Sequence, residues 1–148
     1  MRKQALYILT ALTLTTVAAT RPTHAQSVFA SKFYIPFEFS IRGKAFPAGR
    51  YAVERSSSPD SGFWVIRNER GDRGAIFAVI QLESPAPPDK SQLVFARYGD
   101  AYYLRKVWTA GQSTGYYVVK TNTQRMLEQK LEASVASAEE VILVASRD

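Results

Sequence analysis

The 148-residue sequence contains no cysteine and only one histidine, His24. The absence of cysteine excludes disulfides, thiol redox chemistry, a Cys–His nucleophilic pair and a covalently attached c-type haem. His24 lies in the segment that we interpret next as an export signal, so the mature chain would also lack the base of a Ser-His-Asp triad and the ligands of a Cys/His zinc site. We therefore expect no catalytic residue of these classes, no metal site, no cofactor, and a fold stabilised by packing alone.

The first 25 residues have the layout of a secretory signal peptide. A short positive stretch over residues 1–4 precedes an uncharged run over residues 5–19, and the small-residue exit Thr23-His24-Ala25 follows. A second candidate cleavage site lies after Ala19. The uncharged run is shorter than the ~20 residues that cross a bilayer. We therefore expect cleavage after Ala25 or after Ala19, and a periplasmic or secreted mature protein without a membrane span.

Removal of this segment would change the charge of the protein. The full chain has a formal net charge of +6, and Arg2, Lys3 and Arg21 are lost with the signal while no acidic residue is lost. The mature chain over residues 26–148 would then carry a charge of +3, with its Lys and Arg scattered. Such a charge is an ordinary solubility margin, so we expect no nucleic-acid partner. The length fits one domain.

Alternation of apolar and polar residues predicts a series of short β-strands. In Phe33–Arg42 every second residue is apolar, as in a half-buried strand, and Pro36 places this strand at an edge or at a bulge. Gly99-Asp100 marks a tight hairpin. Ala75–Glu83 is apolar on both faces and is expected to be central. The remaining predicted strands are Tyr51–Arg55, Phe63–Arg67, Gln92–Tyr98, Ala101–Trp108 and Tyr116–Lys120, with Val141–Val144 as a candidate closing strand.

Near the C-terminus the periodicity changes to that of a helix. A helix is predicted over residues 122–138, and Thr121 with Gln124 has the spacing of a capping box. Seven or eight strands joined mostly by turns favour a mainly β fold, an antiparallel meander closing as a small barrel or a sandwich. The single C-terminal helix would cover one end or an open edge. The expected apolar face of the helix comprises Leu127, Leu131, Ser134, Val135 and Ala138.

Three segments resemble a family of small exported bacterial proteins that have PFxF, LPAGxY and LVFxRYGDxYFLxxVW segments and a C-terminal helix. The matching segments here are Pro36–Phe39, Phe46–Tyr51 and Leu93–Leu104, and the resemblance covers most of residues 33–130. The third segment is the most specific, and Phe46 replaces the leucine that is usual in the family. The resemblance implies export and a β-rich domain. It provides no catalytic residue.

Five residues are candidates for a ligand-binding surface. Arg97 and Asp100 flank the Gly99 turn near Tyr102, where they would form a polar clamp at one end of the sheet; the alternative is ordinary hairpin chemistry, in which glycine takes a positive φ. Trp108 and Tyr116 would add to a stacking platform for a sugar or a protein. The alternative for the aromatic residues is cross-strand packing.

Two short motifs also invite a functional interpretation. Gly111–Gly115 fits the G-x-S-x-G nucleophile elbow, but a strand follows it where the elbow requires a helix. Arg70–Asp72 is the tripeptide that integrins recognise, within a segment that also suits a solvated hairpin. We interpret both as loops, and the carboxylates show no spacing that selects a catalytic pair.

These observations favour an exported, non-enzymatic β-domain that binds a small apolar molecule, an envelope glycan or an envelope protein. The alternative is a structural or assembly subunit of the cell envelope that pairs through an edge strand. An enzyme based on carboxylates, lysine or tyrosine ranks third. Nothing in the sequence indicates the oligomeric state. An interior cavity lined by Phe and Tyr would favour the pocket, and a filled interior would favour assembly.

Overall fold

A computed structural model describes residues 30–56, 62–134 and 138–146. The predicted signal peptide lies outside the described residues. The described chain forms ten strands and one helix: β1 (Ser31–Ile35), β2 (Phe39–Ile41), β3 (Lys44–Phe46), β4 (Gly49–Arg55), β5 (Phe63–Asn68), β6 (Gly74–Glu83), β7 (Gln92–Tyr98), β8 (Ala101–Trp108), β9 (Thr114–Val118), α2 (Asn122–Ser134) and β10 (Glu139–Val144).

Eight of the strands follow one another in the order β10-β7-β8-β9-β6-β5-β4-β1, and every pair in this series is antiparallel. The long strand β6 joins the two halves, because Gly74–Ala78 pairs with β5 and Val79–Glu83 pairs with β9. The β2–β3 hairpin attaches to β8 through a parallel contact between Ser40 and Tyr103. The predicted mainly antiparallel β fold with one C-terminal helix is confirmed.

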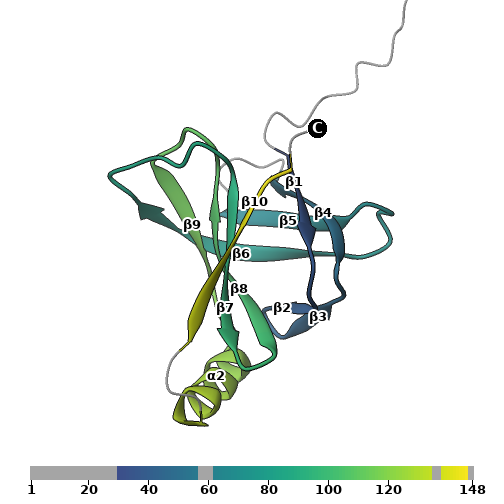
Figure 1. The fold of residues 1–148 in the computed structure, drawn as a ribbon, viewed down its shortest axis with the longest axis vertical. Helices are drawn as coiled ribbons and strands as arrows, with labels where there is room; N and C mark the ends of the chain where they lie inside the picture. Colours follow the sequence, from purple (N-terminus) through teal and green to yellow (C-terminus); the bar gives the residue numbers. More distant parts are fainter. Residues whose placement is uncertain (1–29, 57–61, 135–137, 147–148) are drawn as a thin grey trace, which may run out of the picture.

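The sheet does not close into a barrel. In Figure 1, β1 and β10 lie close together near the C-terminus and then diverge. At the point of approach, the Ser146 amide donates to the Lys32 carbonyl at 2.9 Å. Within the described residues β10 pairs only with β7, and β1 pairs only with β4. The two end strands therefore leave one side of the molecule open.

The strand predicted over Phe33–Arg42 is two strands. Pro36 has no amide hydrogen and falls between β1, which ends at Ile35, and β2, which begins at Phe39. A second difference from the prediction lies in the turn after β2, where Arg42 and Gly43 have positive φ angles of 52° and 86°. This geometry suits a tight hairpin turn and lets β3 form in a segment where no strand was predicted. These two changes account for the larger number of strands.

The core lies between the two halves of the sheet and is filled with aromatic and branched side chains. Phe33, Phe39, Phe46, Phe77 and Phe95 are all completely buried or nearly so. Phe39 has Phe46, Tyr51 and Phe95 around it, with ring centroids between 5.2 and 5.5 Å away. The interior is therefore occupied by the protein's own side chains.

The helix α2 packs near one end of β7 and β8, and the predicted apolar face is wrong in part. Gln124 and Glu128 are the buried residues of its described part, whereas Leu127 is 47% exposed and Ala138 is exposed beyond its end. Leu131 does pack against Ala96, Tyr98 and Tyr103. Val135 lies outside the described residues. The Thr121 hydroxyl accepts from the Gln124 amide at 3.2 Å, which is one half of the predicted capping box. The Gln124 side chain donates to Glu128 and does not complete the box.

Candidate functional site

Three of the five predicted ligand-binding residues lie together at the β7–β8 hairpin. Arg97 and Tyr102 are direct partners in the ladder, and the Arg97 guanidinium lies 5.6 Å from the centroid of the Tyr102 ring. Arg97 also donates from Nε to the Gly99 carbonyl at 2.8 Å and lies 3.4 Å from the Glu139 carboxylate on β10. Asp100 is exposed at the turn. Arg97 is thus engaged in holding the hairpin and β10.

A shallow groove of about 400 Å³ lies beside this hairpin. Asp100 and Tyr102 line it together with Glu38 and Ser40. The Tyr102 ring stacks on Phe37, with ring centroids 3.8 Å apart, so one face of the ring is covered. The groove presents two carboxylates and is open to solvent, unlike the enclosed apolar pockets that hold small apolar ligands.

The other two predicted residues lie at the opposite end of β8 and do not join this group. Trp108 is the ladder partner of Gly115. Tyr116 is only 5% exposed, and its ring lies 5.0 Å from that of Trp64 in the core. The five candidates therefore divide between two ends of the sheet. The contacts of Trp108 and Tyr116 are those of cross-strand and core packing.

Gly115 makes the packing of Trp108 testable. A Cβ atom at position 115 would lie 2.5 Å from two atoms of the Trp108 ring, closer than real Cβ contacts allow. We expect Gly115→Ala to displace the ring and to lower the free energy of unfolding by about 1–3 kcal/mol, the usual cost of overpacking. Chemical denaturation of the variant measures this loss. Gly111→Ala is a poorer control because Gly111 has a φ of 70°, so the exposed Ala86→Gly change, outside the Trp108 contact, serves instead.

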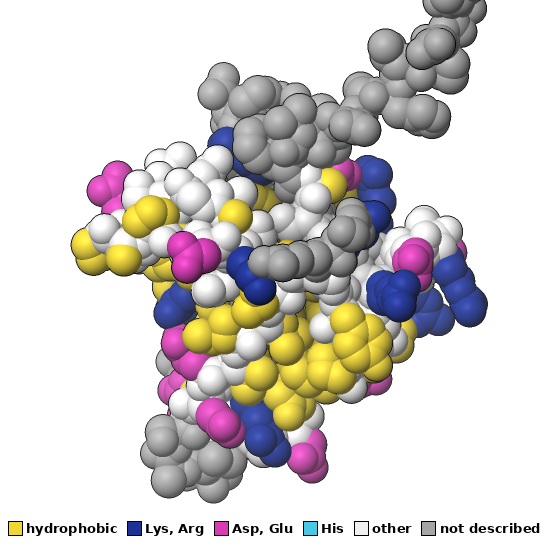
Figure 2. Space-filling model, turned by 45° about the horizontal axis from the view of Figure 1, so that its top comes forward, with side chains coloured by type: hydrophobic (Ala, Val, Ile, Leu, Met, Phe, Trp, Pro, Cys, Tyr) yellow, Lys and Arg dark blue, Asp and Glu magenta, His cyan; other side chains and the backbone are white. Residues whose placement is uncertain are grey.

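Several large hydrophobic residues lie on the open side of the molecule. Tyr34 on β1 and Ile142 and Val144 on β10 are exposed large hydrophobic residues on the two end strands. Phe37, between β1 and β2, is partly buried against the core. Figure 2 looks onto this side of the molecule, where hydrophobic side chains gather below the centre of the view.

The backbone of β10 has one edge that faces away from β7. The Ala145 amide donates to the Ser91 carbonyl on the β7 side, whereas the next amide, Ser146, donates to Lys32 on the opposite side. Amide directions alternate along an antiparallel strand. The amides of Glu140, Ile142 and Val144 therefore point toward the open side. Sequence reasoning named Val141–Val144 only as a candidate closing strand and did not identify this edge.

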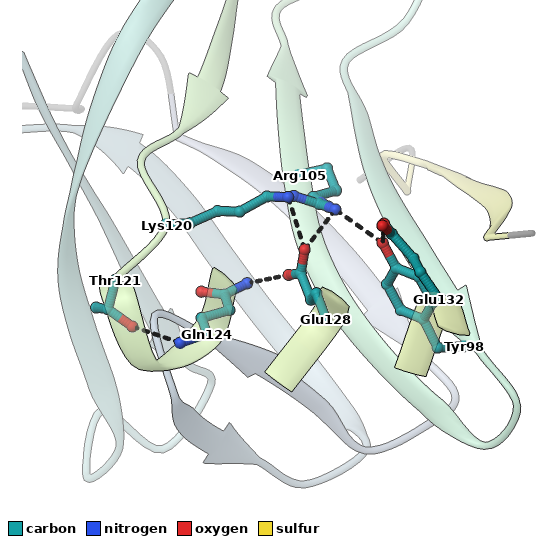
Figure 3. A network of polar contacts seen from close by, with 7 residues as sticks. All are labelled: Tyr98, Arg105, Lys120, Thr121, Gln124, Glu128 and Glu132. Atoms are coloured by element: carbon teal, nitrogen blue, oxygen red, sulfur yellow. Dashed lines mark hydrogen bonds and ion pairs between the residues drawn. The ribbon is translucent and has the colours of Figure 1, made fainter. Parts of the chain in front are cut away.

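A polar network attaches α2 to the sheet (Figure 3). The Glu128 carboxylate is 2% exposed and lies 2.7 Å from Arg105 Nη2 and 2.6 Å from Lys120 Nζ. Gln124 Nε2 donates to the other carboxylate oxygen at 2.8 Å. Burial raises the pKa of Glu128, and it outweighs the lowering by the Gln124 hydrogen bond and by the charge of Arg105. The network has a clear structural task, because it neutralises a buried charge where the helix meets the sheet.

The second half of the network involves Tyr98. Its hydroxyl donates to Glu132 at 2.7 Å and accepts from Arg105 Nη2 at 3.0 Å. Burial, reinforced by the hydrogen bond to Glu132, raises the pKa of Tyr98. The described residues contain no group of three or more potential metal-ligating side chains. Sequence reasoning identified the contact between Thr121 and Gln124 but missed the rest of the network, whose only signal was a Glu at a helical position beside the apolar face.

Both short motifs lie at connections between strands. Residues 111–113 lie in the β8–β9 loop, and Thr114 and Gly115 begin β9, so a strand follows the motif as expected from the sequence. Arg70–Asp72 lies at the β5–β6 turn, where Asn68 Nδ2 donates to the Asp72 carboxylate at 2.6 Å. This hydrogen bond holds the pKa of Asp72 below its ordinary value. The carboxylate is exposed and contributes to the turn through this hydrogen bond, as the hairpin interpretation of the segment requires.

Comparison with family models, with curated proteins and with solved structures found no match. The resemblance to the exported bacterial family therefore stays a prediction. Within the described ranges no helix is long and apolar enough to cross a membrane. What remains to support a function is the geometry itself: a filled core, grooves open to solvent and an open side between β1 and β10.

Proposed function

We propose that the mature chain is an exported, non-enzymatic β-domain of the cell envelope that binds another protein by accepting an extended segment at the open edge of β10. The observation that carries the proposal is the outward direction of the amides of Glu140, Ile142 and Val144 on a strand paired on one side only. A row of such groups is a ready template for an added strand.

The side chains around this edge support a protein partner. Ile142 and Val144 are exposed beside the outward amides. An added strand that is antiparallel to β10 would place its own apolar side chains against them at alternate positions. The added strand could pair with β1 or with β10. Because these two strands run in opposite directions, one added strand can be antiparallel to only one of them. We assign the added strand to β10, which offers more outward amides than β1.

The same observations weigh against the other two ligand classes. A small apolar molecule needs an interior space, and the described interior is filled by buried phenylalanines. A glycan needs exposed aromatic rings that lie together. In the described part of the chain, the exposed aromatic residues are Tyr34 on β1 and Phe63 on β5, which are separated by β4.

Proline at position 142 tests the proposal directly. Ile142→Pro removes an outward amide and leaves the ladder bonds to β7 in place, because those bonds use the alternate residues. Ile142→Thr is the matched control, since it keeps the amide and a β-branched side chain. We expect native mass spectrometry of protein recovered from an exporting host to show a polypeptide partner on the wild type and on Ile142→Thr. The partner should be absent from Ile142→Pro.

Each alternative has its own outcome in this experiment. A mass increase of small-molecule size would support a pocket and contradict the proposal. A partner retained by Ile142→Pro would place the contact elsewhere. A bare monomer for all three proteins, in cross-linked as well as untreated cells, would also contradict pairing at β10. The denaturing mass of the same samples would show whether the chain begins at Gln26.

A further inference from the structure

The positive charge of the protein is concentrated in two turns. Residues 42–50 and 67–74 contain six Lys and Arg but only two acidic residues. The rest of the predicted mature chain contains ten basic and eleven acidic residues, so it is close to neutral. The sequence alone shows scattered basic residues, because the two turns are separated by β4 and β5.

The fold brings the two turns together. The Glu69 amide donates to the Arg50 carbonyl at 3.0 Å, and Lys44 Nζ donates to the Gly74 carbonyl at 2.9 Å. Figure 2 shows Lys and Arg side chains gathered at the end of the molecule that the β5–β6 turn occupies in Figure 1. Arg50, Arg70 and Arg73 line one groove of about 350 Å³ between the turns. We call it the arginine groove.

The walls of the arginine groove are held by hydrogen bonds of their own. Asn68 organises the β5–β6 turn: its side chain bonds to Asp72 and to the Arg73 amide, and its carbonyl accepts from the Gly71 amide. On the other wall, the Tyr51 hydroxyl donates to the Pro47 carbonyl at 2.7 Å. A ligand would therefore meet turns whose backbone is already ordered, which lowers the entropic cost of binding.

The acidic residues of the groove leave the arginines accessible. Arg50 and Glu69 are 3.8 Å apart, with side chains 72% and 70% exposed. An ion pair this exposed is weak, so Glu69 would compete little with a ligand for Arg50. Asp72 accepts a hydrogen bond from Asn68, and the charges of Arg73 and Arg70 also help to lower the pKa of its carboxyl. The three guanidinium groups therefore outnumber the acidic groups of the groove.

We propose that the arginine groove binds a phosphate group through Arg50, Arg70 and Arg73. A phosphate offers several oxygens to planar guanidinium forks, and paired N–H···O bonds of this kind are stronger than neutral ones. The group can come from a lipid headgroup or from a soluble phosphate. This site is separate from the β10 edge, so its test does not depend on the proposed function.

The test compares two triple variants that carry the same net charge. Arg50, Arg70 and Arg73 are replaced by Gln in one, and the exposed Lys90, Arg125 and Lys130 are replaced by Gln in the other. Inorganic phosphate is titrated into the mature protein while the amide resonances of residues 68–74 are followed. Co-sedimentation with phosphatidylcholine vesicles, with and without phosphatidylglycerol, tests the lipid source.

We expect the groove variant to bind at least about tenfold more weakly, as the loss of hydrogen bonds to a charged group implies. The control variant should bind like the wild type. Saturation by inorganic phosphate alone would indicate a soluble ligand, and binding only to vesicles with phosphatidylglycerol would indicate a headgroup.

Three results would overturn the proposal. Equal weakening in the two variants would mean that net charge alone attracts the anion. No binding by the wild type in either arm would mean that no site exists, and unchanged binding by the groove variant would place it elsewhere. If the groove variant unfolds, the same comparison is made with two single variants of exposed residues, Arg70→Gln in the groove and Lys130→Gln as its control.

Discussion

Replacement of Phe95 by alanine is expected to lower the free energy of unfolding by about 3–5 kcal/mol, the usual cost of removing a large aromatic side chain from a packed core. Phe95 is completely buried on β7, opposite Leu104 on β8 and Val141 on β10. Its ring also meets those of Phe37 and Phe39 at 5.3 and 5.5 Å. The Phe95 side chain thus lies where the three neighbouring strands β10, β7 and β8 pack against β2 and the β1–β2 connection.

The matched control for Phe95 is a hydrophobic residue outside the core. Ile76→Ala on the exposed face of β6 should change the free energy of unfolding by no more than about 0.5 kcal/mol. Chemical denaturation followed by far-ultraviolet circular dichroism measures both variants. If Phe95→Ala cost no more than Ile76→Ala, the two halves of the sheet would not share one cooperative core.

The strands were the easiest part to predict, because each half-buried strand shows its inner face as every second residue. Phe33 and Ile35 are both completely buried, as the alternation in β1 requires. The strand prediction was less accurate at positions where backbone geometry determines the ends of a strand. Pro36 ends β1, and the positive φ of Arg42 creates the β2–β3 hairpin. Alternation continues through Pro36, so the proline indicated an edge or a bulge but not the end of one strand and the start of another.

The helix was the hardest part to predict, because its inner face is polar. Pattern analysis assigns apolar residues such as Leu127 to the inside. The position of the helix is determined instead by Arg105 on β8 and by Lys120 in the β9–α2 connection, both of which pair with Glu128. The same reason explains why the arginine groove was missed: Arg50 and Arg73 are far apart in the sequence. Contacts between distant residues leave no local periodicity.

Removal of the Glu128 carboxylate has the second large expected effect. Glu128→Ala leaves Arg105 and Lys120 without their shared partner at the base of α2, and breaking a buried ion pair in this way costs about 3–5 kcal/mol. We expect the lower end of this range, since Lys120 remains partly exposed and Arg105 keeps its contact with Tyr98. Denaturation gives the total loss, and amide exchange in α2 shows whether the helix detaches first. Unchanged stability would mean that Leu131 packing alone holds the helix.

Glu128→Gln separates the charge of this side chain from its shape and gives a pH dependence of defined sign. Burial raises the pKa of Glu128 in the folded protein above its ordinary value of 4.5. A carboxyl group with a raised folded pKa contributes most below the unfolded pKa and loses that contribution as the pH rises through the folded pKa. Relative to Glu128→Gln, the wild type should therefore gain stability as the pH falls from neutrality toward 4.5. The opposite trend would show that attraction to Arg105 and Lys120 outweighs desolvation, and that α2 is held by the charge of Glu128 rather than in spite of it.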